Sequence, residues 1–185
     1  MRHHYATDPA SFGRCRGFAD AIGVDFKAST LNAGQDPTTV QSKVSAYLRN
    51  HPDTQAVLAL GPLSTDPTIK ALKQMGVTGK LWFATFDFDT NIAKAIQDGT
   101  IQFAIDQQPY LQGYIPVAVL AILKKDHTTD PVKIRQALEA NPNFQARLST
   151  YGFAPSYGPR NIGSGPGFIN KENVDKVLKY ADQYR

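Results

Sequence analysis

Polar side chains stand at the ends of two apolar segments near the middle of the chain. Residues 81–86 are almost uniformly apolar and stop at Asp87, and residues 101–105 are followed within two positions by Gln107. If both segments are buried parallel strands, these side chains lie at the carboxyl edge of the sheet, where ligands bind in open α/β folds. Carboxylate and amide groups at such an edge can form hydrogen bonds with pairs of neighbouring hydroxyl groups. The pattern predicts a ligand cleft rather than a catalytic centre.

The surrounding sequence alternates between helical and extended patterns. Short apolar runs predict strands, which are placed at 27–31, 56–60, 81–86 and 101–105. Helical spacing and capping residues predict helices, which are placed at 11–22, 37–50, 67–75, 90–98, 131–140 and 171–184, with a long loop or extended crossing segment at 152–167. Regular alternation with short loops predicts an α/β fold with an open parallel sheet flanked by helices.

Composition is that of a globular chain with one core and an appendage. The 185 residues are 42% hydrophobic and 19% charged. The net charge is +4, but Lys and Arg are spread along the chain without a run of five, so we expect no nucleic-acid partner. Cys15 is the single cysteine, so no internal disulfide can form. The chain has no apolar run of membrane-spanning length, and its start predicts no secretory signal peptide.

Several short motifs in register carry a resemblance to a known family. They are R-x-x-G-F at 14–18, H-P-D at 51–53, F-D at 86–87, D-G-x-I at 98–101, Q-x-P at 107–109 and G-P-G-F-I-N-K-E-N-V at 165–174. In this order they resemble the ribose-type (type I) periplasmic sugar-binding proteins of bacterial ABC importers. No single motif is specific, and the resemblance rests on their shared order.

The resemblance implies a partial chain. Members of that family have two similar lobes joined by a hinge, and this chain resembles the C-terminal lobe and tail only. Residues 1–108 would form that ligand-binding lobe with its first strand clipped, since only Arg2–Ala6 remains to fill a central strand. Residues 109–185 would add a hinge-crossing helix, an extra helix, an extended loop and a C-terminal helix.

The resemblance also implies which residues meet the ligand. Asp87 matches a family aspartate that contacts ligand hydroxyls, and Gln107 matches a hinge glutamine with the same role. The alternative for Asp87 is a helix cap, and for Gln107 an amide that satisfies backbone groups. A helix cap or a backbone partner would leave either residue with a purely structural role.

Other pocket positions depart from the family pattern. Phe12 stands where a pocket arginine is expected, Gln35 where an aromatic side chain is expected, and Gly61 where an asparagine is expected. We therefore expect a sugar or polyol other than ribose. The alternatives are a core aromatic for Phe12 and a solvated loop amide for Gln35.

In the family, function consists of ligand binding, closure of the two lobes and docking on a membrane permease in the periplasm. The resemblance implies no cofactor, no metal and no catalysis. The helix expected at Tyr110–Leu123 is strongly apolar and would lack its usual partner lobe. We expect it to fold back on the lobe or to pair with a second chain in a homodimer.

Two alternatives remain open at this stage. The effector-binding lobe of a LacI-type transcription regulator shares the same fold. The order Asp87-Phe88-Asp89-Thr90 also resembles the D-x-D-x-T motif of haloacid dehalogenase-type phosphatases, in which Asp87 would be the nucleophile and Asp89 the acid/base beside Mg²⁺. The downstream lysine and acidic pair of that enzyme class have no convincing match.

Overall fold

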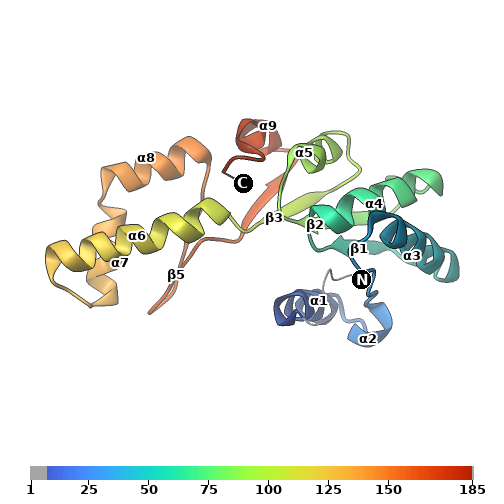
Figure 1. Cartoon of the computed structure of the whole chain (residues 1–185), viewed down its shortest axis with the longest axis horizontal. Coiled ribbons are helices and arrows are strands. Elements are labelled where there is room, and N and C mark those ends of the chain that lie inside the picture. The colour runs from blue at the N-terminus through green and yellow to red at the C-terminus, as the bar shows by residue number, and fades with distance from the viewer. Residues whose placement is uncertain (1–7, 185) are drawn as a thin grey trace.

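A mixed sheet forms the centre of the larger part of the molecule (Figure 1). The computed structural model describes residues 8–184, and within them the main sheet has the strand order β1-β2-β3-β6. Its strands are β1 (Ala56–Ala59), β2 (Trp82–Phe86), β3 (Phe103–Asp106) and β6 (Gly167–Asn170). The first three are parallel, and β6 runs antiparallel to β3. The expected α/β class with a largely parallel sheet is confirmed.

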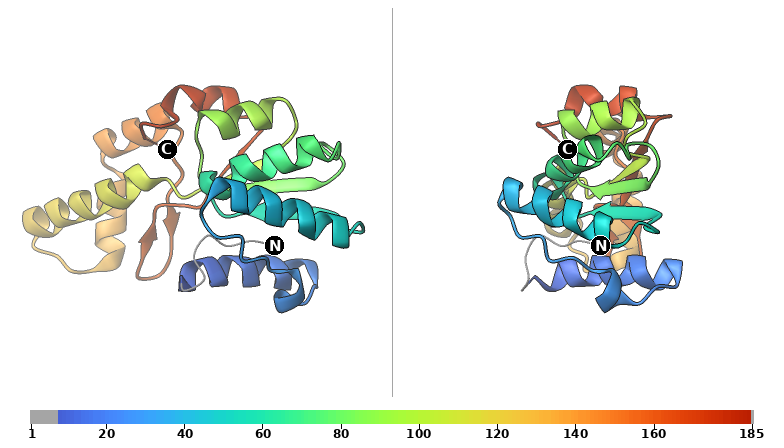
Figure 2. Two further views of the ribbon diagram at one scale, coloured as in Figure 1. Left: turned by 45° about the vertical axis from the view of Figure 1, so that its right-hand side comes forward. Right: turned by 90° about the vertical axis from the view of Figure 1, so that its right-hand side faces the viewer.

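Helices cover both faces of this sheet because successive strand residues point to opposite sides. Val57 and Ala59 pack into the core under α3 (Pro37–Asn50) and α4 (Pro62–Gln74). Leu58 instead packs on the other face, under α1 (Pro9–Ile22), with the buried Cys15. Figure 2 shows α1 on the opposite side of the sheet from α3.

Helix starts follow a common local rule. In α1, α3, α7 (Pro131–Glu139) and α8 (Pro142–Tyr151), an Asp or Asn side chain accepts hydrogen bonds from first-turn amides and proline occupies the next position. Proline suits this place because its missing N–H would have no helical partner there. These starts are therefore determined locally.

A second core lies to one side of the sheet (Figure 1). It is built on α6 (Pro109–Asp126), which packs with α7 and α8. A short antiparallel hairpin, β4 (Ser156–Tyr157) with β5 (Ile162–Gly163), lies beside it. The buried side chains of this core are Leu111, Ile115, Ile122, Ile134, Leu138, Phe144 and Phe153. Over residues 8–184, no helix is both long and apolar enough to cross a membrane.

After the second core the chain returns to the first. Strand β6 joins the main sheet, and α9 (Val174–Val177) packs beside α5 (Thr90–Gln97), with a 3₁₀ turn at Leu178–Tyr180. The helix predicted over 171–184 is therefore wrong beyond this short segment. Val174 and Val177 are buried against the first core, so tertiary burial rather than helix length determines this segment.

Other sequence-based predictions need correction. The strand predicted at 27–31 is wrong: Asp25 accepts a bond from the Ala28 amide and starts the short helix α2 (Phe26–Ser29). Helix α4 begins at Pro62 rather than at 67, with Pro67 inside it. Helix α8 and strand β6 were not predicted from the sequence, and the segment Arg2–Ala6 lies outside the described residues.

Candidate ligand-binding site

Asp87 occupies a tight turn directly after β2. Its φ of 63° is in the left-handed region, and its backbone N–H donates to the Ile105 carbonyl at 2.9 Å. This bond holds the turn against the neighbouring strand β3. The side chain is half-buried at the carboxyl edge of the sheet.

Gln107 follows β3 and meets Asp87 at this edge. Its Nε2 donates to Asp87 Oδ1 at 2.5 Å, and its Oε1 accepts from Arg14 Nη2 at 2.6 Å. The Arg14 guanidinium carbon lies 4.6 Å from the centre of the Phe86 ring, close enough for a cation–π contact. We call Arg14, Gln107 and Asp87 the edge network; it joins α1 to the ends of β2 and β3.

Gln108 holds together the segments that cross between the two cores. Its side chain is fully buried, with a φ of 52°. Its Oε1 accepts from the Ala154 N–H at 2.6 Å, and its Nε2 donates to the Ala154 carbonyl at 2.9 Å and to the Ser164 carbonyl. The Ser164 hydroxyl in turn donates to the Gln107 carbonyl at 2.9 Å. These bonds place the backbone that carries Gln107.

The other sequence-predicted site residues lie outside the edge network. Phe12 is 39% exposed on α1, and its ring packs at 6.1 Å from that of Phe26. Gln35 is exposed in the loop before α3. Gly61 is buried with a φ of 118° at the start of α4, where its carbonyl accepts the Thr65 hydroxyl at 2.8 Å.

Asp89, rather than Asp87, caps the following helix. Its Oδ1 accepts the Ile92 N–H at 2.7 Å, so the helix-cap alternative for Asp87 is wrong. Burial raises the pKa of Asp89, and the nearby carboxylates of Asp66 and Asp182 add to this rise, while the bond from Ile92 opposes it. Two aspartates two positions apart thus have different surroundings: one lies in the edge network and the other starts α5.

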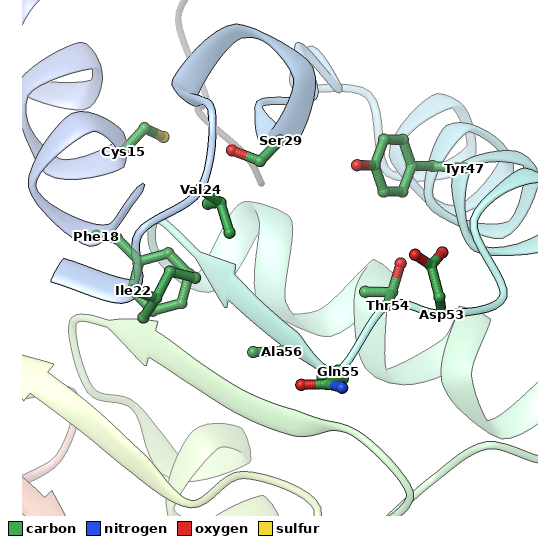
Figure 3. A pocket seen from close by; sticks show the side chains of 10 residues that line it. All are labelled: Cys15, Phe18, Ile22, Val24, Ser29, Tyr47, Asp53, Thr54, Gln55 and Ala56. Atoms are coloured by element: carbon green, nitrogen blue, oxygen red, sulfur yellow. The ribbon is translucent and has the colours of Figure 1, made fainter. Parts of the chain in front are cut away.

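A cavity of about 380 Å³ lies away from this edge (Figure 3). It is lined on one side by α1 side chains such as Phe18 and on the other by residues 53–56, which lead into β1. The amino end of β1 is opposite the carboxyl edge, where Asp87 and Gln107 lie. This cavity is therefore separate from the predicted site, and side-chain chemistry makes the edge the better candidate.

Sequence reasoning missed Arg14 as a member of the edge network. Its position in the R-x-x-G-F motif was apparent, but its partner lies 93 positions away in the sequence. The paired glutamines at 107 and 108 were a usable signal for Gln108, since a buried amide after a strand must find backbone partners. Which partners it finds depends on the return of the chain through Ala154 and Ser164.

The chain is similar to known proteins in sequence and in fold. A family described as a periplasmic binding protein domain matches residues 4–127. The xylose/arabinose-binding protein XylF of Sulfolobus acidocaldarius is 28% identical over 162 residues, a match that covers 82% of this chain and 40% of that protein.

Solved structures share the fold over nearly the whole chain. A carbohydrate transporter from Acidothermus cellulolyticus in complex with myo-inositol is 25% identical with a TM-score of 0.68, covering 98% of this chain and 54% of that one. A solute-binding protein of an ABC transporter from Agrobacterium vitis with bound D-fucose is 19% identical with a TM-score of 0.63, covering 97% and 53%. The chain thus spans 40% to 54% of the length of these relatives.

Proposed function

The chain belongs to the periplasmic binding protein domain family, and from this premise we propose that it binds a sugar or polyol for an ABC importer. The observation that carries the proposal is the edge network, in which a carboxylate and an amide meet at the carboxyl ends of parallel strands. Parallel sheets bind ligands at that edge, and vicinal hydroxyls suit such paired groups. The named ligands of the xylose/arabinose-binding relative and of the myo-inositol complex support this substrate class.

Within this proposal, Asp87 and Gln107 contact ligand hydroxyls. Phe12 would cover the apolar side of a sugar ring, and Gln35 and Gly61 would shape the pocket. Because these last positions depart from the ribose-type pattern, we propose a ligand other than ribose. We propose binding without catalysis, because the family consists of binding proteins.

The cellular context follows from family membership. A periplasmic binding protein works outside the cytoplasmic membrane, and we propose the periplasm as the location and an ABC permease as the partner. The carbohydrate transporter among the solved structures supports this context over the effector lobe of a LacI-type regulator. Asp89 is occupied as the cap of α5, which disfavours the phosphatase alternative that needs Asp89 as acid/base.

We further propose that residues 1–108 form the ligand-binding lobe and that the crossing helix begins at 109. Strand β6 pairs with β3, and α9 packs beside α5, which supports adding residues 167–181 to this lobe. Helices α6, α7 and α8 share a core of their own. On this division, Gln107 lies at the boundary between the two parts.

Thermal-shift measurements test the ligand proposal. The compounds to be added are D-xylose, L-arabinose, myo-inositol and D-fucose. Their concentration is tens of millimolar, because we expect weak binding by a chain that spans about half of the length of the solved relatives. A ligand at ten times its Kd stabilises the native state by about 1.4 kcal/mol, which raises Tm by roughly 3–6 °C in a protein of this size. We expect such a rise with at least one compound and its loss in Asp87→Ala. An equal rise in Tm for Asp87→Ala would show that Asp87 does not contribute to the ligand site.

We propose that the exposed face of α6 pairs with a second copy of this chain. One face of α6 packs with α7 and α8, so the helix does not fold back on the sheet. The other face presents an apolar stripe at helical spacing, with Val117 66% and Leu120 63% exposed. The stripe consists of Gly113, Pro116, Val117, Leu120 and Ala121. Contiguous apolar surface of this kind marks an interaction site.

Light scattering after size exclusion tests this pairing. We expect a dimer at about 100 μM and a monomer for Leu120→Glu, since a buried unpaired carboxylate strongly opposes association. Val132→Glu is the matched control, because Val132 is 58% exposed but lies on α7 and is not part of the stripe. A monomer at every concentration for the unchanged protein would contradict the pairing.

A further inference from the structure

We propose that Arg14 is a positioning residue of the ligand site. Its guanidinium holds the Gln107 amide in one orientation and so prepares Asp87 to accept a hydrogen bond from a ligand hydroxyl. This inference rests on the proposed function and deepens it, because it names the donor and acceptor pattern that the ligand must match.

The chemistry of the three side chains allows a single arrangement of the amide. Arginine has only donors, and an ionised aspartate has only acceptors. The amide oxygen of Gln107 must therefore face Arg14, and its nitrogen must face Asp87, as the bonds of 2.6 and 2.5 Å show. Asp87 alone would hold the amide at its nitrogen only, whereas Arg14 also binds its oxygen, so the amide is fixed at both ends.

Arg14 is itself held in place. It is half-buried on α1, and its guanidinium lies over the ring of Phe86, the last residue of β2. Stacking on an aromatic face uses the planar shape of the guanidinium, which a lysine ammonium does not have. Arg14 thus connects α1 to the ends of β2 and β3.

The hydrogen-bonding groups that the edge network leaves available define which ligand groups can bind there. Within the described residues, the hydrogen bonds of the edge network use Asp87 Oδ1 and leave Oδ2 as an acceptor. The second N–H of Gln107 Nε2 and further guanidinium N–H groups of Arg14 are donors. An acceptor beside donors matches two neighbouring hydroxyls, of which one donates to Asp87 and the next accepts. Ligands with an ether or carbonyl oxygen at the first position cannot donate and are excluded.

A ligand-free NMR experiment tests the positioning directly. The side-chain Nε2 protons of Gln107 are assigned from their loss in Gln107→Glu. In the unchanged protein we expect one of them to be shifted downfield and protected from exchange by its bond to Asp87. Arg14→Ala should reduce both the downfield shift and the protection, because the amide is then held by Asp87 alone, and Arg14→Lys should restore them in part because a donor faces Oε1 again. Unchanged signatures in Arg14→Ala would overturn the proposal.

Binding of D-xylose and myo-inositol, titrated by NMR, provides the second measurement. We expect about tenfold weaker binding in Arg14→Ala, corresponding to the loss of one charge-assisted contact, and a smaller loss in Arg14→Lys. Arg49→Ala is the control, since Arg49 is exposed in the last turn of α3. Equal affinity in Arg14→Ala and the unchanged protein would also overturn the positioning role. If neither compound binds the unchanged protein, the ligand proposal fails. The exchange of the Gln107 Nε2 protons in the ligand-free protein then still tests the role of Arg14.

Discussion

Replacing Gln108 with leucine is expected to lower the free energy of unfolding by roughly 3–5 kcal/mol. Leucine has nearly the same volume, so the change removes hydrogen bonds and leaves packing almost intact. The Ala154 N–H, the Ala154 carbonyl and the Ser164 carbonyl all lose their partner; Gln108 is fully buried, whereas Ala154 is exposed and Ser164 is half-buried. An unsatisfied buried backbone group costs about 1–3 kcal/mol, and the partial exposure of these residues places each loss near the lower end of that range.

Urea denaturation followed by circular dichroism measures this loss. Gln145→Leu is the matched control, because Gln145 is exposed on α8, and we expect it to stay within about 0.5 kcal/mol of the unchanged protein. A similar free energy of unfolding for Gln108→Leu and the control would show that water replaces the lost partners. In that case Gln108 would not hold the crossing segments together.

The second large effect is expected for Tyr110→Ala, which should cost roughly 3–4 kcal/mol of stability. Tyr110 is the centre of an aromatic cluster that joins α6 to the end of the chain. Its ring centre lies 5.7 Å from those of Tyr114 and Phe153 and 5.3 Å from that of Tyr184. Removal of the ring leaves a cavity and releases the C-terminal segment from the second core.

Tyr110→Phe separates the ring from its hydroxyl. The hydroxyl accepts a bond from Arg147 Nη1 at 2.5 Å, but Arg147 is exposed, so we expect a loss of only about 1 kcal/mol or less. Urea unfolding gives both values, and near-ultraviolet circular dichroism reports the packing of the tyrosines. A loss in Tyr110→Phe as large as that in Tyr110→Ala would mean that the hydroxyl bond, rather than ring packing, stabilises the cluster.

Local signals in the sequence predicted much of the framework. The apolar runs at β1, β2 and β3 were recognisable because strands covered on both faces are apolar throughout. The starts of α3 and α7 were recognisable because an aspartate followed by proline satisfies first-turn amides without distant partners. Such elements depend on neighbours within a few positions.

Elements that depend on distant contacts were missed or misplaced. Strand β6 contains glycine and asparagine and has little strand character of its own, yet it pairs along β3. The segment 27–31 looked extended, but the bond from the Ala28 amide to Asp25 favoured a helical turn. The last helix is short because Val174 and Val177 are drawn into the first core.

The candidate site divides in the same way. The positions of Asp87 and Gln107 at the ends of strands were predictable from local apolar runs and the residues after them. The bond between these two side chains, the bond from Arg14 to Gln107 and the burial of Gln108 became apparent only in the folded protein. These relations join positions 20 to 93 residues apart, so they depend on how helices and strands pack rather than on any local pattern.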